Sequence, residues 1–382
     1  MEGIGVTQAT SENVLDAVGR AVRAVHGLAS GPAGVVVGVS TDVGTRVEAA
    51  GMADVAGRLL LPSTRFDVAS VSKVVATTTS MHRLASLGVM RLDEPVERFV
   101  PGTGCAPGTT VSTLMRHRAG LWEWQPLYLA RTPDGDRADP FDALAALPLR
   151  YPPDDRRAYS DLGFILLGRV VEKVTGMPLD RAVSELVTVP IGLSETGYGP
   201  VTGDVAASAS GDGIEQEMIR TGSPYPVLYA QEDVAWRSYE LVGEVNDGNC
   251  YRAFGGVSGH AGIFSTVADL LRLGRSLAGA GERDDLWRPD ITSQIFAEGP
   301  DAGQALGWRT MPVQLGGEPR TMLWHPGFTG CGIGLVPGTG VAVAMLSNRL
   351  VSPEPLPTAL LWSTALSSLG LADDQEHEGS RP

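Results

Sequence analysis

Segments typical of β-strands lie near both ends of this chain, and the long stretch between them has mostly helical periodicity. Short runs rich in β-branched and aromatic residues occur at residues 34–40, 45–50, 307–313, 321–324, 332–336 and 341–347. The simplest way to pair these runs is one antiparallel sheet built from both chain ends and flanked by helices. We therefore expect an α/β (α+β) fold with a mostly helical inserted region.

This pattern also predicts how the chain is divided. We expect a single domain over residues 1–372, with a sheet lobe of about 1–66 and 300–370 and a helical lobe of about 67–299. The acidic segment 373–382 is expected to be a disordered tail. The seam between two lobes is a usual place for a cleft, so we expect the active site there.

Charge and cysteine spacing exclude several classes of function. The 382 residues include 44 acidic and 30 basic side chains, a formal net charge of −14, which disfavours nucleic acid and anionic membranes as partners. The N-terminus lacks a signal-peptide pattern, so we expect a cytoplasmic protein. The three cysteines are widely spaced, and we expect neither a metal nor another cofactor. The oligomeric state stays open.

Ser70 and Lys73 lie three residues apart, on one face of an expected buried helix that ends near Gly88. A hydroxyl beside an ammonium that burial can deprotonate is a nucleophile with its base. The chain has only two lysines, and an arginine could not act as a base near neutral pH. From this motif alone, a capping serine with a surface lysine is an equally good interpretation.

Two further motifs could contribute to the same site. Tyr159 and Asp161 precede an apolar helix, where a phenol and a carboxylate can both reach a cleft. The alternative is a turn tyrosine followed by an aspartate that caps the helix. His325 and Gly327 end a strand, and the N–H of Phe328 could stabilise an oxyanion. The alternative there is a bulge and a turn.

The segment 199–249 is polar, aromatic and longer than an ordinary connection. Its aromatic side chains could cover a cleft and exclude water, or they could simply attach the loop to the core. These side chains are Tyr225, Tyr229, Trp236 and Tyr239.

Taken together, the three motifs resemble those of the serine β-lactamase-like superfamily, and they follow its order along the chain. The nearest branches are the class C β-lactamases, the DD-peptidases of their kind and the related esterases. The likeness covers about residues 66–349. Supporting phrases occur at residues 91–96, 114–121, 259–266 and 346–349.

The resemblance implies a β-lactamase-like fold in which Ser70 is acylated. It implies that Lys73 and Tyr159 form the general-base pair, and which of them takes the proton stays open. It further implies an oxyanion hole made by the N–H groups of Ser70 and Phe328. The residues implied to bind substrate are Asp161, His325 and Gly327.

Three positions depart from the β-lactamase pattern. Asp161 stands where the lactamases usually have Asn, and its charge should favour the charged form of Lys73. His325 stands where they have Lys, and Pro326 supplies neither a hydroxyl nor a backbone N–H. Because those groups help to bind the carboxylate of a β-lactam, the pattern is more similar to the esterases and acyltransferases of the superfamily.

We therefore expect acyl transfer through an acyl-Ser70 intermediate, as an esterase, amidase or transacylase acting on a small ester or amide. The acceptor would be water, an amine or an alcohol. The resemblance extends to transacylases of bacterial specialised metabolism, such as the amide-forming enzyme of capuramycin-type antibiotic assembly. The alternatives are a β-lactamase or D-amino-acid peptidase, and a catalytically idle ligand-binding homologue.

Overall fold

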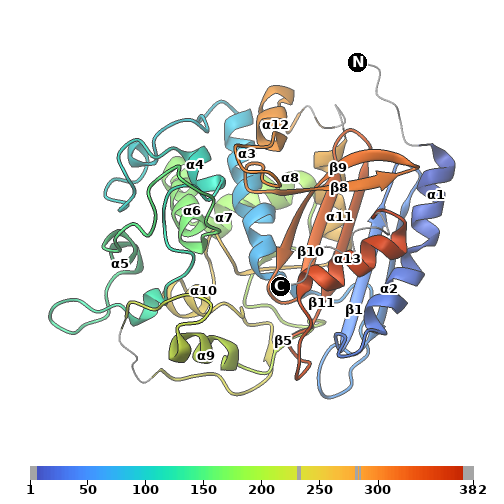
Figure 1. Cartoon of the computed structure of the whole chain (residues 1–382), viewed down its shortest axis with the longest axis horizontal. Coiled ribbons are helices and arrows are strands. Elements are labelled where there is room, and N and C mark those ends of the chain that lie inside the picture. Colours follow the sequence, from blue (N-terminus) through green and yellow to red (C-terminus); the bar gives the residue numbers. More distant parts are fainter. Residues whose placement is uncertain (1–6, 230–233, 280–282, 284, 373–382) are drawn as a thin grey trace.

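A six-stranded antiparallel sheet forms the centre of one half of the molecule, in the order β2-β1-β11-β10-β9-β8. The computed structural model describes residues 7–229, 234–279, 283 and 285–372; the expected tail at 373–382 lies outside them. Two strands come from the start of the chain and four from its end, as the sequence predicted (Figure 1). Their bounds are β1 (Gly34–Ser40), β2 (Thr45–Gly51), β8 (Arg309–Leu315), β9 (Glu318–Gly327), β10 (Cys331–Val336) and β11 (Val341–Ser347).

The two chain ends meet at the middle of this sheet. β1 pairs with β11 from Val35 opposite Ser347 to Ser40 opposite Ala342. Every residue of both strands is buried, because helices cover both faces of the sheet. This explains why their sequences are continuous apolar runs rather than alternating ones.

Helices from distant parts of the chain cover the sheet. One face carries α2 and α13, with α1 alongside, and the other face carries α11 (Figure 1). Their bounds are α1 (Gln8–Asp16), α2 (Val18–His26), α11 (Val267–Ala278) and α13 (Thr358–Leu369). The sequence placed residues 267–278 in the helical lobe, but α11 packs on β1, β10 and β11. The leucine side chains on one face of α11 are buried because they pack against the apolar face of the sheet.

The remaining helices form the second half of the molecule (Figure 1). Their bounds are α3 (Thr79–Ser86), α4 (Val111–Met115), α5 (Pro140–Ala145), α6 (Asp161–Thr175), α7 (Leu179–Val183), α8 (Val189–Ile191), α9 (Gly213–Thr221), α10 (Gly248–Ala253) and α12 (Pro289–Phe296). A single apolar core runs from these helices to the α11 face of the sheet. The two halves therefore share one core. The division into a sheet lobe of about 1–66 and 300–370 and a helical lobe of about 67–299 stays a proposal.

Short strands connect the helical half to the sheet half. Their bounds are β3 (Phe66–Asp67), β4 (Gly197–Tyr198), β5 (Ala207–Ala209), β6 (Leu241–Val242) and β7 (Ile263–Ser265). β3, β7 and β4 form a small separate sheet. Among the described residues, no helix is long and apolar enough to cross a membrane; a cytoplasmic location stays a prediction from the sequence.

Candidate active site

Ser70 lies on a constrained turn directly after β3. Antiparallel pairing with β7 holds β3 in place, and the chain then enters a 3-10 turn over Ala69–Val71. Ala69 has a φ of 48°, a left-handed conformation that costs energy for a residue with a Cβ. The Asp67 carboxylate stabilises this turn by accepting the Ala69 N–H at 2.8 Å. The turn presents the partly exposed Ser70 side chain to the cleft.

The helix that follows Ser70 is less regular than its sequence predicted. Its first part, Lys73–Thr78, is π-helical, and only then does α3 begin. The Thr79 hydroxyl donates a hydrogen bond of 2.6 Å to the Val74 carbonyl. β-Branched residues are weak α-helix formers, so this run tolerates a wider turn when packing fixes it. Single π-helical turns are frequent at functional sites.

Lys73 is fully buried and its ammonium contacts the nucleophile. Its Nζ donates to Ser70 Oγ at 2.8 Å and to the His260 carbonyl at 3.3 Å. It also forms an ion pair of 2.6 Å with Asp161 Oδ1. The side chain has no exposed surface, so the alternative interpretation of a capping serine with a surface lysine is wrong.

Two opposing effects set the charge of Lys73. Burial lowers its pKa, but the Asp161 carboxylate and then Tyr159 more than compensate, so the pKa lies above its ordinary value. Lys73 is therefore an ammonium at neutral pH. In this state it orients the Ser70 hydroxyl by donating to it, and it must lose a proton before it can act as a base.

Asp161 can pair with Lys73 because Ser160, the residue before it, caps the helix instead. Ser160 is the N-cap of α6, and its hydroxyl accepts the Gly163 N–H at 3.2 Å. The alternative in which Asp161 is the cap is therefore wrong. As the first residue of α6, Asp161 directs its carboxylate to the buried ammonium instead.

The Asp161–Lys73 pair predicts a shift in pH dependence. Asp161→Asn removes the charge that raises the pKa of Lys73, and burial then lowers that pKa. If neutral Lys73 is the base, the rate rises with pH through this pKa, so the acidic limb of the kcat/KM profile should move to lower pH. Rate profiles between pH 5 and 10 check this. Asp180→Asn, in the exposed first turn of α7, is the matched control, and an unmoved limb would exclude Lys73 as the base.

Tyr159 sits among cationic and aromatic groups. The Lys73 Nζ lies 5.0 Å from its ring centroid, and the Arg309 guanidinium lies 5.5 Å from it. His117 stacks on it at 4.6 Å, with its Nδ1 accepting the Ser160 N–H at 3.0 Å. The sequence did not single out His117 as a site residue, although it lies in one of the family-like phrases.

His325 lies behind Tyr159, with the two ring centroids 6.1 Å apart. Its Nδ1–H donates to the Pro326 carbonyl at 2.9 Å. Burial, followed by the charges of Lys73 and Arg309, holds its pKa well below the usual range. His325 is therefore a neutral imidazole, and it does not line the cavity described below. His325 can therefore affect a substrate only indirectly, through the positions of Tyr159 and of the end of β9.

Gly327 marks a close approach between β9 and the nucleophile turn. A Cβ at this position would lie 2.3 Å from the Val68 carbonyl oxygen, so only glycine fits. The next residue, Phe328, lines the same cavity as Ser70. Among the described residues, neither the Ser70 nor the Phe328 N–H donates a hydrogen bond to another group. Both donors are therefore available to an oxyanion.

This close approach predicts a large effect from one methyl group. Gly327→Ala should push β9 away from Val68 and displace the Phe328 N–H, lowering kcat/KM by about a hundredfold, as for loss of one oxyanion donor. Steady-state kinetics and thermal unfolding together check this. Gly197→Ala is the control, since its added Cβ meets nothing within 4 Å. Unchanged kinetics in a folded Gly327→Ala variant would remove Phe328 from the oxyanion hole.

A cavity of about 660 Å³ opens beside Ser70. Four of the expected site residues line it, namely Ser70, Tyr159, Asp161 and Phe328. Lys73, His325 and Gly327 lie behind its wall. The volume suits a small organic substrate.

The described part of the segment 199–249 contains a helix, α9, that was not predicted from the sequence. Apolar residues at 214, 218 and 219 and a left-handed Gly222 after the helix were the signal for it.

Tyr225, Tyr229 and Trp236 pack in a cluster around Trp124, and Tyr225 also lines the cavity. Tyr239 is exposed and does not line it. Attachment of the loop to the core is therefore seen for three of the four side chains, and exclusion of water stays a prediction.

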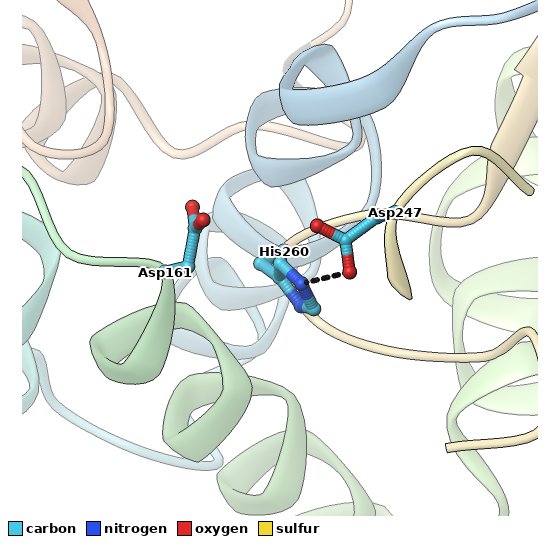
Figure 2. A group of neighbouring side chains, drawn as sticks. All are labelled: Asp161, Asp247 and His260. Carbon is cyan, nitrogen blue, oxygen red and sulfur yellow. Dashed lines mark hydrogen bonds and ion pairs between the residues drawn. The ribbon is translucent and has the colours of Figure 1, made fainter. Parts of the chain in front are cut away.

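Three metal-ligating side chains come together that the sequence did not associate. The ligand atoms of Asp161, Asp247 and His260 all lie within 4.8 Å of one another (Figure 2). Some of their ligand atoms already have partners within the protein, because Lys73 pairs with Asp161 Oδ1 and His260 Nε2 bonds to Asp247 Oδ1 at 2.9 Å. The buried ammonium thus already supplies a cation to this cluster. The three residues are far apart in sequence, so no spacing rule could have found them.

Known proteins share both the sequence pattern and the fold. The Beta-lactamase family matches residues 22–364. A putative D-alanyl-D-alanine carboxypeptidase of Escherichia coli K12 is 30% identical over 321 residues, which cover 77% of this chain and 71% of that protein.

Solved structures show the same fold at lower sequence identity. A class C β-lactamase from Rhodobacter sphaeroides superposes with a TM-score of 0.65 at 20% identity, covering 94% of this chain and 98% of that one. EstCE1, described as a hydrolase with promiscuous acyltransferase activity, gives 0.63 at 20% identity, covering 95% and 98%. The family and relative names are those of serine hydrolase-type enzymes. The chain belongs to the Beta-lactamase family.

Proposed function

We propose that this protein is a serine-dependent acyl-transfer enzyme that acts on a small ester or amide as an esterase, amidase or transacylase. The observation that carries the proposal is the 2.8 Å contact between Ser70 Oγ and a fully buried Lys73 at the wall of a substrate-sized cavity. A buried lysine beside a hydroxyl at a constrained turn is the arrangement that nucleophilic catalysis requires.

The chemistry follows from the positions of the groups. The Lys73–Tyr159 pair first releases one proton to solvent. Ser70 Oγ then attacks the carbonyl carbon, and its proton passes to this deprotonated pair. The N–H groups of Ser70 and Phe328 stabilise the oxyanion of the tetrahedral intermediate. The same pair returns the proton to the leaving alcohol or amine, and the acyl group stays on Ser70 until water or another acceptor attacks.

An acylation experiment tests this proposal. Intact-protein mass spectrometry should show one fluorophosphonate adduct, mapped by peptide analysis to Ser70, and a transient acyl adduct with p-nitrophenyl acetate. An adduct elsewhere, or no adduct on a preparation that hydrolyses the ester, would overturn the mechanism. A folded protein that neither reacts nor turns over any ester would be the idle ligand-binding homologue.

A D-amino-acid peptidase is the second candidate, because the curated relative quoted above is named as a putative carboxypeptidase. A peptide ending in D-alanyl-D-alanine and a β-lactam therefore belong in the same panel. Both carry a carboxylate, and the described residues lining the cavity include no lysine, arginine or histidine. We accordingly expect esters to react at least about tenfold faster than either, a difference of ~1.4 kcal/mol in the barrier.

The finer proposal is that the enzyme transfers its acyl group to an amine, as a transacylase of specialised metabolism such as antibiotic assembly would. Tyr225 supports this finer proposal, because a half-buried aromatic wall beside Ser70 would restrict water around the acyl-enzyme. Adding a small amine at millimolar concentration should divert part of the product from acid to amide. Tyr225→Ala should restore hydrolysis, and Tyr239→Ala, at an exposed position outside the cavity, should not. If the ratio of amide to acid does not change when the amine is added, the enzyme is a hydrolase that does not transfer to amines.

A further inference from the structure

We propose that the cavity beside Ser70 selects substrates carrying a protonated amine, and that Asp247 and Glu215 bind this ammonium group. The inference rests on the acyl-transfer function proposed above and adds the substrate class. The ammonium could belong to the acyl donor or to an amine acceptor, and the experiment below separates the two sources.

The cavity wall is strongly biased in charge. Five acidic residues line it, and the described residues of the wall include no basic side chain. Three of the five already have cationic partners. Asp161 pairs with Lys73, Asp212 with the buried Arg237 at 2.7 Å, and Glu217 with Arg220 on the surface.

Glu215 has no cationic partner among the described residues. It accepts hydrogen bonds from the Tyr128 hydroxyl at 2.6 Å and from the Gly248 N–H at 2.9 Å, both neutral donors.

Asp247 has no lysine or arginine in direct contact within the described part of the chain; burial opposes its ionisation, but its contact with His260 and the charge of Lys73 bring its pKa below the ordinary value. Asp247 uses one oxygen, Oδ1, to accept from His260 and from the Cys250 N–H. Its second oxygen receives no hydrogen bond from the described residues; Figure 2 marks a bond to His260 from the other oxygen alone.

Two carboxyl groups near Asp247 have pKa values above the ordinary range. Burial, with added repulsion from Asp247 and Asp212, raises the pKa of Glu215 to about 7. Burial also raises the pKa of Asp67 to about 6, and Asp247 contributes to that shift. An ammonium bound between Glu215 and Asp247 would relieve this repulsion, because an opposite charge favours the ionised form of each carboxyl group.

The aromatic groups of the cavity differ in their charged neighbours. Arg309 lies 5.5 Å from the ring of Tyr159, but neither it nor Arg157 lines the cavity. Trp124 and Tyr225 add aromatic surface to the cavity wall itself, and such surfaces attract alkylammonium groups. The acyl carbon at Ser70 and an ammonium near Glu215 would therefore share one cavity. A carboxylate near Glu215 would be repelled, because every charged side chain among the described lining residues is acidic.

Three matched esters test the charge preference of the donor. They are the p-nitrophenyl esters of heptanoic acid, 6-aminohexanoic acid in its ammonium form and adipic acid, which are neutral, cationic and anionic with similar chains. We expect kcat/KM for the cationic ester to exceed that for the neutral one by about ten- to a hundredfold, the range for a bond to a charged group. The anionic ester should be the poorest. Raising the salt concentration from 50 to 500 mM should reduce the cationic preference.

A parallel arm tests the acceptor. With the neutral ester, 1,3-diaminopropane should give at least about tenfold more amide than propylamine at equal free-amine concentration, if the ammonium belongs to the acceptor. A preference in either arm supports the proposal and assigns the ammonium to one source. Equal rates in both arms, or a preference for the anionic ester, would overturn it.

Two variants connect the preference to the named residues. Glu215→Gln and Asp247→Asn should each lower the ratio of kcat/KM for the cationic ester to that for the neutral ester by at least about fivefold. This ratio remains informative even if a variant lowers the rate with both esters. Asp180→Asn, which removes an exposed carboxylate on α7 outside this cavity, should leave the ratio unchanged. Asp247→Asn keeps an oxygen for the Cys250 N–H, and Glu215→Gln provides the test if that variant misfolds. Acylation of Ser70 by the neutral ester with no charge preference would refute this inference alone, whereas absence of any acylation would refute the proposed function.

Discussion

Replacing Ser70 by alanine should lower kcat for ester hydrolysis by a factor between roughly a thousand and a million, because the covalent route disappears entirely. The residual rate would come from binding and from the oxyanion donors, which the substitution leaves in place. Ester kinetics and intact mass measure the two consequences together, and the fluorophosphonate adduct should vanish with the activity.

Ser80→Ala is the matched control for this experiment. Ser80 lies on α3, further along the same helical run, and its buried hydroxyl has no hydrogen-bond partner among the described residues. Removing it should therefore change neither stability nor rate by more than about 0.5 kcal/mol. If Ser70→Ala retained more than a tenth of the activity while Ser80→Ala lost it, the nucleophile assignment would be wrong.

Lys73→Arg should be almost as inactive as Lys73→Ala, with kcat/KM lower by at least about a hundredfold, or ~2.7 kcal/mol. Arginine keeps the positive charge beside Asp161 but cannot release a proton near neutral pH. Its guanidinium must also fit a site with no exposed surface. Kinetics at several pH values and thermal unfolding of both variants measure the result.

Lys173→Arg provides the control, since the other lysine of the chain is exposed on α6. It should be indistinguishable from the unmodified protein. If a folded Lys73→Arg variant kept more than about a tenth of the rate, a loss under ~1.4 kcal/mol, Lys73 would act through its charge rather than as a base. The proton of Ser70 would then pass to Tyr159.

The sequence was sufficient for the sheet and for the order of the motifs. β1 and β11 are mostly apolar runs of seven residues, and their short length and valine content favour a strand buried on both faces over a helix. Ser70 and Lys73 share a helical face because of their spacing alone, so their contact at 2.8 Å was predictable. Local patterns also singled out Tyr159 and Phe328, and the family resemblance added their expected roles; both residues line the same cavity as Ser70.

Only the tertiary structure decided the electrostatic state of the site. Burial, the Asp161 carboxylate and Tyr159 fix the charge of Lys73 together, and none of these effects is a property of residues 70–73. Asp247 and Glu215 lie on segments far from the nucleophile in sequence, and their positions depend on packing around α9 and α10. Charge and burial act through space over several ångströms, so they are set by which distant segments meet rather than by local spacing.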